Sequence, residues 1–447
     1  MVSAYWNRLS LGSRAILVLV PVLLVVGAVL TVAVALLLGP LLSFIGANLP
    51  LGRFVLAATA LIVVTIPIAF LIIYMELKVI AAINLRVGPD RVGPYGAFMS
   101  VVHGLKVLSK EDFTPLGVDV PIFTLAPIVV FASIPLTLLV IPFAPGLYGQ
   151  DFNLALLYFF AIGGMSVVGL MMAGWASLNK YSLLGALRAA AQAISYELPL
   201  TLSVVGIIIL AGTMSLNSIV HQQAGSLFDW NIWKQPLGFI IFFIAATAEA
   251  NRTPLDMTEA DSEIVAGFAT EYSGMRFGFF FFAEYVNVFV VSALSAVLFF
   301  GGWNAPFDWP WPFHMDWLQP LNFGLAGWTA IILVGIIGGV ELLAPVVRLV
   351  GGKTWDMTST MAMSLLITVL LAVGLLGLAG FIAFDLVRGL VWFMAKTYFF
   401  VIVFVWMRAT LPRVRVDQLM GFAWKWLLPA SLLNLFVTAT AVVLLNR

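Results

Sequence analysis

Two hydrophobic segments, IIFFIAATAE at 240–249 and FGFFFFAEYVNVFVV at 277–291, each carry a glutamate inside an otherwise apolar run. Glu249 and Glu284 enclose an acidic loop, and seven of the chain's 21 acidic residues lie in this stretch. An ionisable group at bilayer depth costs at least ~2.5 kcal/mol on insertion scales, so it usually faces protein, water or a partner charge. Two such carboxylates beside an acidic loop predict a proton path through a helical membrane protein.

The rest of the chain has the composition of a polytopic membrane protein. Of its 447 residues, 62% are hydrophobic and only 10% are charged, which excludes an ordinary soluble domain. A transmembrane helix needs ~20 mostly apolar residues, and eleven runs approach this length. The predicted transmembrane helices lie near 15–38, 54–76, 121–142, 153–176, 196–212, 236–250, 279–301, 327–347, 360–384, 390–408 and 427–445.

The distribution of basic residues predicts the orientation in the membrane. If the N-terminus is cytoplasmic, most of the 22 lysines and arginines fall in inner loops or at inner helix ends, as the positive-inside rule requires. The acidic loop lies on the same side. We therefore expect a multi-pass protein of a bacterial plasma membrane, with its N-terminus and large loops in the cytoplasm. The net charge of +1 gives no indication of a nucleic-acid partner.

The chain has no cysteine and only three histidines, which lie in loops or at helix ends: His103, His221 and His314. The lack of cysteine excludes disulfides, thiolate zinc sites and cysteine-ligated iron–sulfur clusters in this chain. A haem held between helices would need histidines inside the spans. We therefore expect the chain to bind no metal or redox cofactor itself.

The first long inner loop, 76–119, contains two Arg-Val-Gly-Pro repeats, at 86–89 and 91–94. Their prolines and glycines favour a stiff turn. After the turn, apolar residues recur at helical spacing, while His103 and Lys106 lie on other faces. The apolar residues are Phe98, Val101, Val102, Leu105 and Leu108. The pattern predicts an amphipathic helix in the membrane interface; an ordinary polar connector is the alternative.

A second inner loop is expected at 179–199. In it Arg188, Gln192 and Ser195 share one helical face, and Glu197 then enters the membrane. Two interpretations of Glu197 remain open. The carboxylate is either neutralised by Arg188 or Lys180, or it handles protons.

In the acidic loop, Pro254 predicts the end of the helix that carries Glu249. The spacing of Asp256, Glu259 and Glu263 places them on one helical face, with Asp261 elsewhere. Stacked like charges hold protons more readily. The alternative, a solvated acidic start of a helix, does not explain the two glutamates inside apolar runs.

The last inner segment, 406–418, carries three arginines at the end of a predicted helix. They are Arg408, Arg413 and Arg415. For this segment, anchoring at the cytoplasmic edge of the membrane is favoured over pairing with an acidic partner.

Taken together and in this order, the loops resemble the H subunit of the proton-translocating NADH–quinone oxidoreductases, the respiratory complex I family. The resemblance covers about 50–305 and 387–445. The matching stretches are 86–94, 104–112, 173–177, 180–197, 249–254, 259–274, 283–285, 301–303 and 408–418.

The resemblance implies a membrane subunit of a multisubunit oxidoreductase that is not active alone. Such a subunit forms the membrane side of a quinone chamber and couples quinone reduction to proton translocation. Quinone is the substrate, and flavin mononucleotide and iron–sulfur clusters are expected in partner subunits. The partners implied are the peripheral-arm subunits of the quinone site and small adjacent membrane subunits.

The resemblance also implies residue roles. Glu197, Glu249 and Glu284 would form the proton path. The coupling loop would contain Asp256, Glu259, Asp261, Glu263 and Glu271. The quinone chamber would include Glu76, His103, Lys106 and Arg252. His103 stands where the family usually has aspartate, which implies a different quinone or pH dependence. The chain also departs from the family pattern at Leu77, where arginine is usual, and in the acidic loop, which has Leu255, Thr258 and Asp261 where phenylalanine, proline and glutamate are typical.

The sequence has eleven predicted spans, three more than the eight of the family. The expected division is an additional N-terminal segment at 1–50, the quinone-chamber and proton-path core at 51–306, an inserted loop with two transmembrane helices at 307–386, and the last two family helices at 387–447. We expect the additional spans to lie at the periphery or against another subunit.

Two other functions share part of this evidence. A related subunit of a membrane-bound hydrogenase or ferredoxin-linked complex would carry overlapping motifs, because the electron donor is bound by other chains. A stand-alone proton-coupled transporter is less favoured, since the sequence has no internal repeat of the kind common in transporters. A purely structural anchor would leave Glu197, Glu249 and Glu284 unexplained.

Overall fold

The structure is a computed structural model that describes residues 50–145, 147–257, 266–306 and 385–445. Within these ranges all regular structure is helical, apart from one isolated bridge between Ala144 and Leu147. The long helices are α3 (Pro50–Ile83), α5 (Val120–Thr137), α6 (Ala155–Ala176), α7 (Lys180–Ala211), α10 (Pro236–Glu249), α12 (Gly274–Phe299), α15 (Asp385–Thr410) and α17 (Leu428–Leu445). Shorter helices are α4 (Met99–Leu108), α8 (Leu216–Gln222), α9 (Asn231–Lys234) and α16 (Val416–Phe422).

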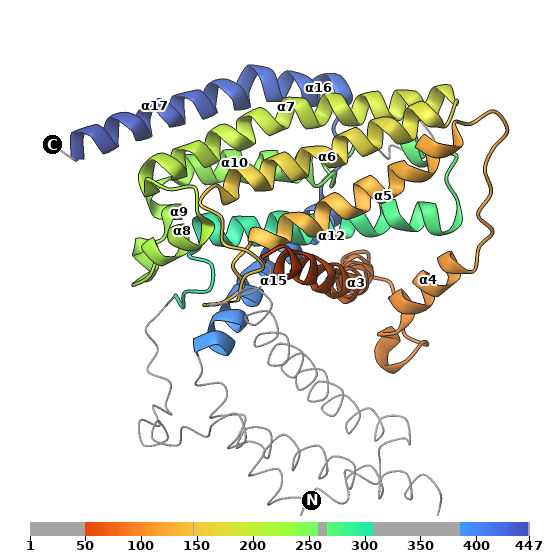
Figure 1. Cartoon of the computed structure of the whole chain (residues 1–447), viewed down its shortest axis with the longest axis horizontal. Helices are drawn as coiled ribbons and strands as arrows, with labels where there is room; N and C mark the ends of the chain where they lie inside the picture. The colour runs from red at the N-terminus through yellow and green to blue at the C-terminus, as the bar shows by residue number, and fades with distance from the viewer. Residues whose placement is uncertain (1–49, 146, 258–265, 307–384, 446–447) are drawn as a thin grey trace, which may run out of the picture.

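The helices form a bundle in which α5, α6, α7 and α17 lie side by side in this order (Figure 1). Helix α10 packs on α7, and α12 packs on α5, α3 and α15. The best-buried helix is α12, which lies at the centre with nearly all of its second half inaccessible. The acidic loop leaves α10 and returns to the start of α12, so both of its ends are held by the core.

Seven segments of the described ranges are long and apolar enough to cross a bilayer. Helix α10 has 14 residues, or about 21 Å, which is less than the ~30 Å of a hydrocarbon core. The prediction of an all-helical membrane protein is confirmed. The count of eleven spans stays a prediction, because 15–38, 327–347 and 360–384 lie outside the described residues, as do most of the proposed segments 1–50 and 307–386.

The inner loop predicted at 179–199 and the span predicted at 196–212 are one continuous helix of 32 residues, α7, so the predicted start of this helix is wrong. The side chain of Asn179 caps its start by accepting a hydrogen bond from the backbone N–H of Tyr181 at 2.9 Å. Alanine and leucine, which favour helix, dominate the next turns, and Pro199 is tolerated inside the helix because neighbouring helices cover it. Charges at Lys180, Arg188 and Glu197 lowered the hydropathy of the first half of α7, so only the second half was predicted as a span.

The helix predicted after the Arg-Val-Gly-Pro repeats is confirmed as α4. It lies beside α3 and α12, on a long excursion between α3 and α5 (Figure 1). Its apolar residues remain between 38% and 59% exposed, so within this chain they face outward. The preceding helix α3 runs on to Ile83, which places Glu76 inside a helix instead of at the start of the loop.

Helices α6 and α7 meet through small residues. A Cβ built on Gly174 would overlap the Cβ of Ala186 and would lie 2.8 Å from the carbonyl oxygen of Ser182. Small residues at such crossings let helix backbones approach closely in membranes. The contact fixes the position of α7 along its axis relative to α6, and with it the position of Glu197.

Replacing Gly174 by alanine should therefore destabilise the bundle by ~1–3 kcal/mol, the usual cost of overpacking. The matched control is Gly163→Ala on the same helix, where a Cβ would meet nothing within 4 Å. The measurement is the temperature at which the purified, tagged protein loses its monodisperse peak. Equal midpoints for the two variants would contradict the close crossing.

The chain on either side of the undescribed segment 307–384 comes together. A Cβ built on Gly389 would lie 3.3 Å from the Cβ of Trp303. Lys396 Nζ, inside α15, donates to the carbonyl oxygens of Phe300, Gly302 and Asn304 at 2.6, 2.9 and 2.5 Å, and it lies 4.2 Å from the ring centroid of Trp230. Helix α15 is therefore held against residues 300–304 by direct contacts.

Candidate functional site

Glu76 of α3 is the centre of a buried charge cluster. Its Oε1 accepts hydrogen bonds from Arg408 Nη1 at 2.6 Å and from the hydroxyl of Tyr285 at 3.2 Å. Its Oε2 accepts from Arg252 Nη1 at 3.4 Å. Residues from α3, α12, α15 and the loop after α10 thus converge on one carboxylate, whose residue is only 7% exposed.

Arg252 connects this cluster to the predicted proton path. It is 3% exposed, its Nη1 lies 3.3 Å from Glu284 Oε1, and its guanidinium carbon lies 4.3 Å from the ring centroid of Tyr285. Burial alone would lower the pKa of Arg252, but the charges of Glu284 and Glu76 outweigh it and raise the pKa above its usual range. Arg252 therefore stays a cation that Glu76 and Glu284 share.

Asp256 lies in an irregular segment and its Oδ2 is 3.3 Å from Arg413 Nη2. The backbone N–H of Val414 donates to the carbonyl of Pro254 at 3.0 Å, which ties this segment to the chain after α15. The prediction that Asp256 shares a helical face with Glu259 and Glu263 is therefore wrong for Asp256, because an arginine partner holds it outside a helix. Glu259, Asp261 and Glu263 lie outside the described residues.

The preference for membrane anchoring in the last inner segment is wrong for two of its three arginines. Arg408 and Arg413 point inward, to Glu76 and Asp256. Arg415 is exposed and pairs at 3.3 Å with the exposed Asp417. The sequence could not reveal the pairs of Arg408 and Arg413, because both join residues that are more than 150 positions apart.

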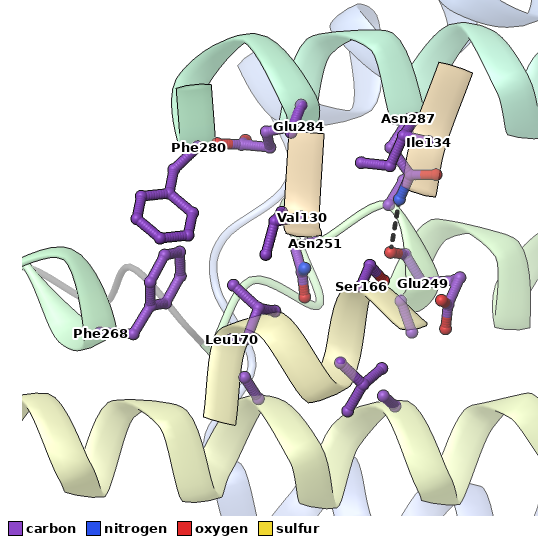
Figure 2. Close-up of a pocket in the computed structure, with 16 residues that line it drawn as sticks. Val130, Ile134, Ser166, Leu170, Glu249, Asn251, Phe268, Phe280, Glu284 and Asn287 are labelled. Atoms are coloured by element: carbon purple, nitrogen blue, oxygen red, sulfur yellow. Dashed lines mark hydrogen bonds between the residues drawn. The ribbon is translucent and has the colours of Figure 1, made fainter. Parts of the chain in front are cut away.

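A cavity of about 50 Å³ lies between α5, α6, α7 and α12, and both Glu284 and Glu249 line it. Figure 2 shows the two glutamates with Asn251 and Asn287 around it. The side-chain amide of Asn287 donates to the backbone carbonyl of Glu249 at 3.0 Å. One water needs roughly 10–15 Å³ of such volume, so the cavity has room for a few waters between the carboxylates.

A second cavity, of about 40 Å³, is lined by Glu249 and Glu197. Asn287 and Ser166 border both cavities. Glu249 therefore stands between Glu284 and Glu197, and its Oε2 is buried without a hydrogen-bond partner in the described part of the chain. The three glutamates that the sequence analysis identified therefore follow one another in the order Glu284, Glu249 and Glu197, with a cavity between each pair. We call these three residues and the two cavities the polar line.

Glu197 has no ion-pair partner among the described residues. Arg188 precedes it by nine residues on the same helix, which is about 13 Å along the axis, and Lys180 is farther away. The interpretation in which one of these cations neutralises Glu197 is therefore wrong. A carboxylate that borders a cavity without a cation beside it is suited to carry a proton.

The predicted polar face of α7 has a positional role. Gln192 Nε2 donates to the carbonyl oxygens of Ala248 and Leu255 at 2.7 and 2.8 Å, and thereby holds the turn that follows Glu249. Ser195 Oγ accepts from the indole N–H of Trp424 at 3.1 Å. These contacts fix α7 against α10 and against the π-helical turn at Ala423–Leu427.

The other predicted site residues lie away from the polar line. Glu271 accepts a hydrogen bond from Asn179 Nδ2 at 2.6 Å, at the start of α7. His103 and Lys106 are exposed on α4, and neither side chain bonds to the Glu76 cluster within the described ranges. In the same ranges no group of three histidine, aspartate or glutamate residues has an arrangement that could hold a metal ion.

Four residues of the site were missed by the sequence analysis in these roles: Tyr285, Arg408, Asn287 and Ser166. Tyr285 follows Glu284 directly and Asn287 follows it by three residues, so the polar residues next to Glu284 on that helix were the available signal. Arg408 was noticed only as one of several arginines. Ser166 stands in an apolar helix and gave no signal.

Comparisons with known proteins show the family of the chain. The sequence matches the family model for NADH dehydrogenase over residues 55–439. It is 41% identical over 386 residues to an H subunit of the NADH-quinone oxidoreductase of Solibacter usitatus, an alignment that covers 83% of this chain and 91% of that protein. It is 40% identical over 389 residues to the H subunit of Brevibacillus brevis, covering 87% and 93%, and 39% identical over 372 residues to that of Dehalococcoides mccartyi, covering 83% and 82%.

Proposed function

The chain belongs to the family of NADH–quinone oxidoreductase H subunits, and from this premise we propose that it forms the membrane side of the quinone chamber and couples quinone reduction to proton translocation. The observation that carries the proposal is the line of carboxylates from the buried Glu76 through the half-buried Glu284 and Glu249 to Glu197. Arg252 joins the first two, and the two cavities join the rest.

The charge cluster would respond to a charge that forms beside it. Its carboxylates Glu76, Glu284 and Asp256 are balanced by Arg252, Arg408 and Arg413. Negative charge that develops on a quinone beside the cluster would compete with Glu76 and Glu284 for the arginines. Glu284 would then lose part of the attraction that keeps it ionised, and a proton on it would become more favourable.

From Glu284 the proton would move through the first cavity to Glu249. The free Oε2 of Glu249 can accept it, and the bond from Asn287 to the backbone keeps this carboxyl between the two cavities. The second cavity would then carry the proton to Glu197. Waters in cavities of this size can bridge carboxylates that do not touch.

The remaining roles follow from the same proposal. Glu259, Asp261, Glu263 and Glu271 would belong to the loop that couples the quinone site to the path, and His103 and Lys106 on α4 would face the chamber together with peripheral-arm subunits. Flavin mononucleotide and iron–sulfur clusters would be held by those partners, and small membrane subunits would cover the Glu197 end. The large loops would face the cytoplasm of a bacterium, and 307–386 would be an addition to the family core.

The proposal is tested by gentle purification through a tag on this chain. We expect a large assembly with flavin and iron–sulfur subunits and with inhibitor-sensitive NADH–quinone activity. An assembly that takes electrons from hydrogen or ferredoxin instead would contradict the assigned electron donor. Proton transport by the isolated chain in vesicles would contradict the subunit role altogether.

Replacing His103 by aspartate should change the pH profile of quinone reduction. Histidine is the side chain that titrates in the physiological range, whereas aspartate stays ionised there. The measurement is the reductase rate of the intact complex across neutral pH. The matched control is His221→Gln, an exposed histidine of α8 beside Trp303. If His103→Asp and the control give the profile of the unmodified complex, His103 has no place in the chamber.

A further inference from the structure

Two amide side chains are buried at the end of α10 that is opposite Glu249. Gln235 immediately precedes α10 and is 2% exposed, and Asn434 on α17 is 5% exposed. Neither amide atom of Gln235, nor the Nδ2 of Asn434, bonds to another protein atom in the described ranges. An amide that is buried in this way is unfavourable, and more so in a membrane protein, where bulk water cannot reach it.

Two glycines make room beside these amides. A Cβ on Gly206 of α7 would lie 2.8 Å from Gln235 Nε2. A Cβ on Gly238 of α10 would lie 2.9 Å from Gln235 Oε1 and 3.1 Å from Asn434 Nδ2. Since the last two distances share one point, the two amide atoms lie within about 6 Å of each other, a gap that a single bridging water can span.

We propose that Gln235 and Asn434 bind an ordered water that joins the start of α10 to α17. Gln235 Oε1 accepts a hydrogen bond from this water, and Asn434 Nδ2 donates one to it. The water thereby satisfies a donor and an acceptor that the protein leaves unpaired, and it holds the C-terminal helix α17 against the bundle. A methyl group at Gly238 would press on both amides, and one at Gly206 would press on the amide of Gln235, so both positions require glycine.

This site is separate from the polar line of the proposed function. It lies at the other end of α10, about 20 Å from Glu249 along the helix. On α7, Gly206 follows Glu197 by nine residues, which places it on the opposite face of the helix. A change at the water site should therefore alter stability without altering the coupling of quinone reduction to protons.

The test is a cycle of variants in the intact, tagged complex: Gln235→Leu, Asn434→Leu and the double variant. Each single change leaves the other amide unpaired and should lower the midpoint temperature of heat dissociation, whereas the double change removes both polar groups and should recover most of that loss. Gly206→Ala should mimic a single change. The matched control, Gln222→Leu, alters an exposed glutamine of α8 that bonds to the carbonyl of Ala211 and should have little effect.

A cryo-electron microscopy map of the intact complex, at a resolution that shows ordered waters, gives an independent result. Density between the two amides supports the proposal. A direct bond between the two amides with no density between them would overturn it. Losses in the double variant that equal the sum of the single losses would also overturn it, because two groups that share a water cannot act independently.

Discussion

Replacing Glu249 by glutamine should lower the NADH–quinone reductase rate of the complex at least about ten-fold, with assembly unchanged. Glutamine has the shape of glutamate but cannot carry a proton, and positioned proton carriers contribute ~100-fold or more to the rates they serve. Glu249 borders both cavities, so its loss interrupts the path at its middle. Its neighbour Asn287 bonds to the backbone and not to the carboxylate, so the local structure should be kept.

The measurement is the inhibitor-sensitive reductase rate and the accompanying acidification of membrane vesicles. The matched control is Asp151→Asn, because Asp151 accepts hydrogen bonds from Ser215 and Asn217 and lines neither cavity. Glu284→Gln should also lower the rate. Normal rates and normal acidification in both glutamine variants would refute the path.

The second large effect is expected for Glu76→Gln, which should destabilise the protein by ~3–5 kcal/mol. This is the usual cost of removing one partner from a buried ion pair. Arg408 and Arg252 would be left close together without the carboxylate that separates their charges. We expect a low yield of assembled complex and early dissociation on heating. Arg408→Gln in the same chain should restore part of the yield, because it removes one of the two opposed cations.

The exposed pair of Arg415 and Asp417 provides the control for this prediction. Its side chains are 75% and 68% exposed, and such surface pairs contribute no more than ~1 kcal/mol. The yield and the dissociation temperature of Asp417→Asn should therefore be close to those of the unmodified protein. If Glu76→Gln behaves like Asp417→Asn, the carboxylate of Glu76 does not hold the cluster together.

The parts of the fold that the sequence predicted have strong local signals. Apolar runs of the length of a bilayer correspond to α3, α5, α6, α12, α15 and α17, and Pro254 correctly predicted the break after Glu249. The helix α4 was predicted from apolar spacing alone. Glu249 and Glu284 stood out because charge inside an apolar run is costly and seldom lacks a purpose.

The parts that the sequence did not predict depend on contacts between distant residues. Only the second half of α7 was predicted as a span, because charged residues interrupt the hydropathy of its first half. The packing of Gly174 on Ala186 that supports the first half is visible only in three dimensions. The partners of Arg408 and Arg413 could not be read from their basic surroundings. In the same way, nothing near Lys396 in the sequence indicates the three carbonyl groups that surround its ammonium.

The central claim is that a proton reaches Glu249 when quinone is reduced. Infrared difference spectra of the intact complex, recorded as quinone is reduced, report the change in protonation of buried carboxyl groups. We expect a band of a protonated carboxyl group that shifts in heavy water and is absent from Glu249→Gln. The same band at full strength in Glu249→Gln would contradict the claim, since the proton would then be carried by a group outside this path.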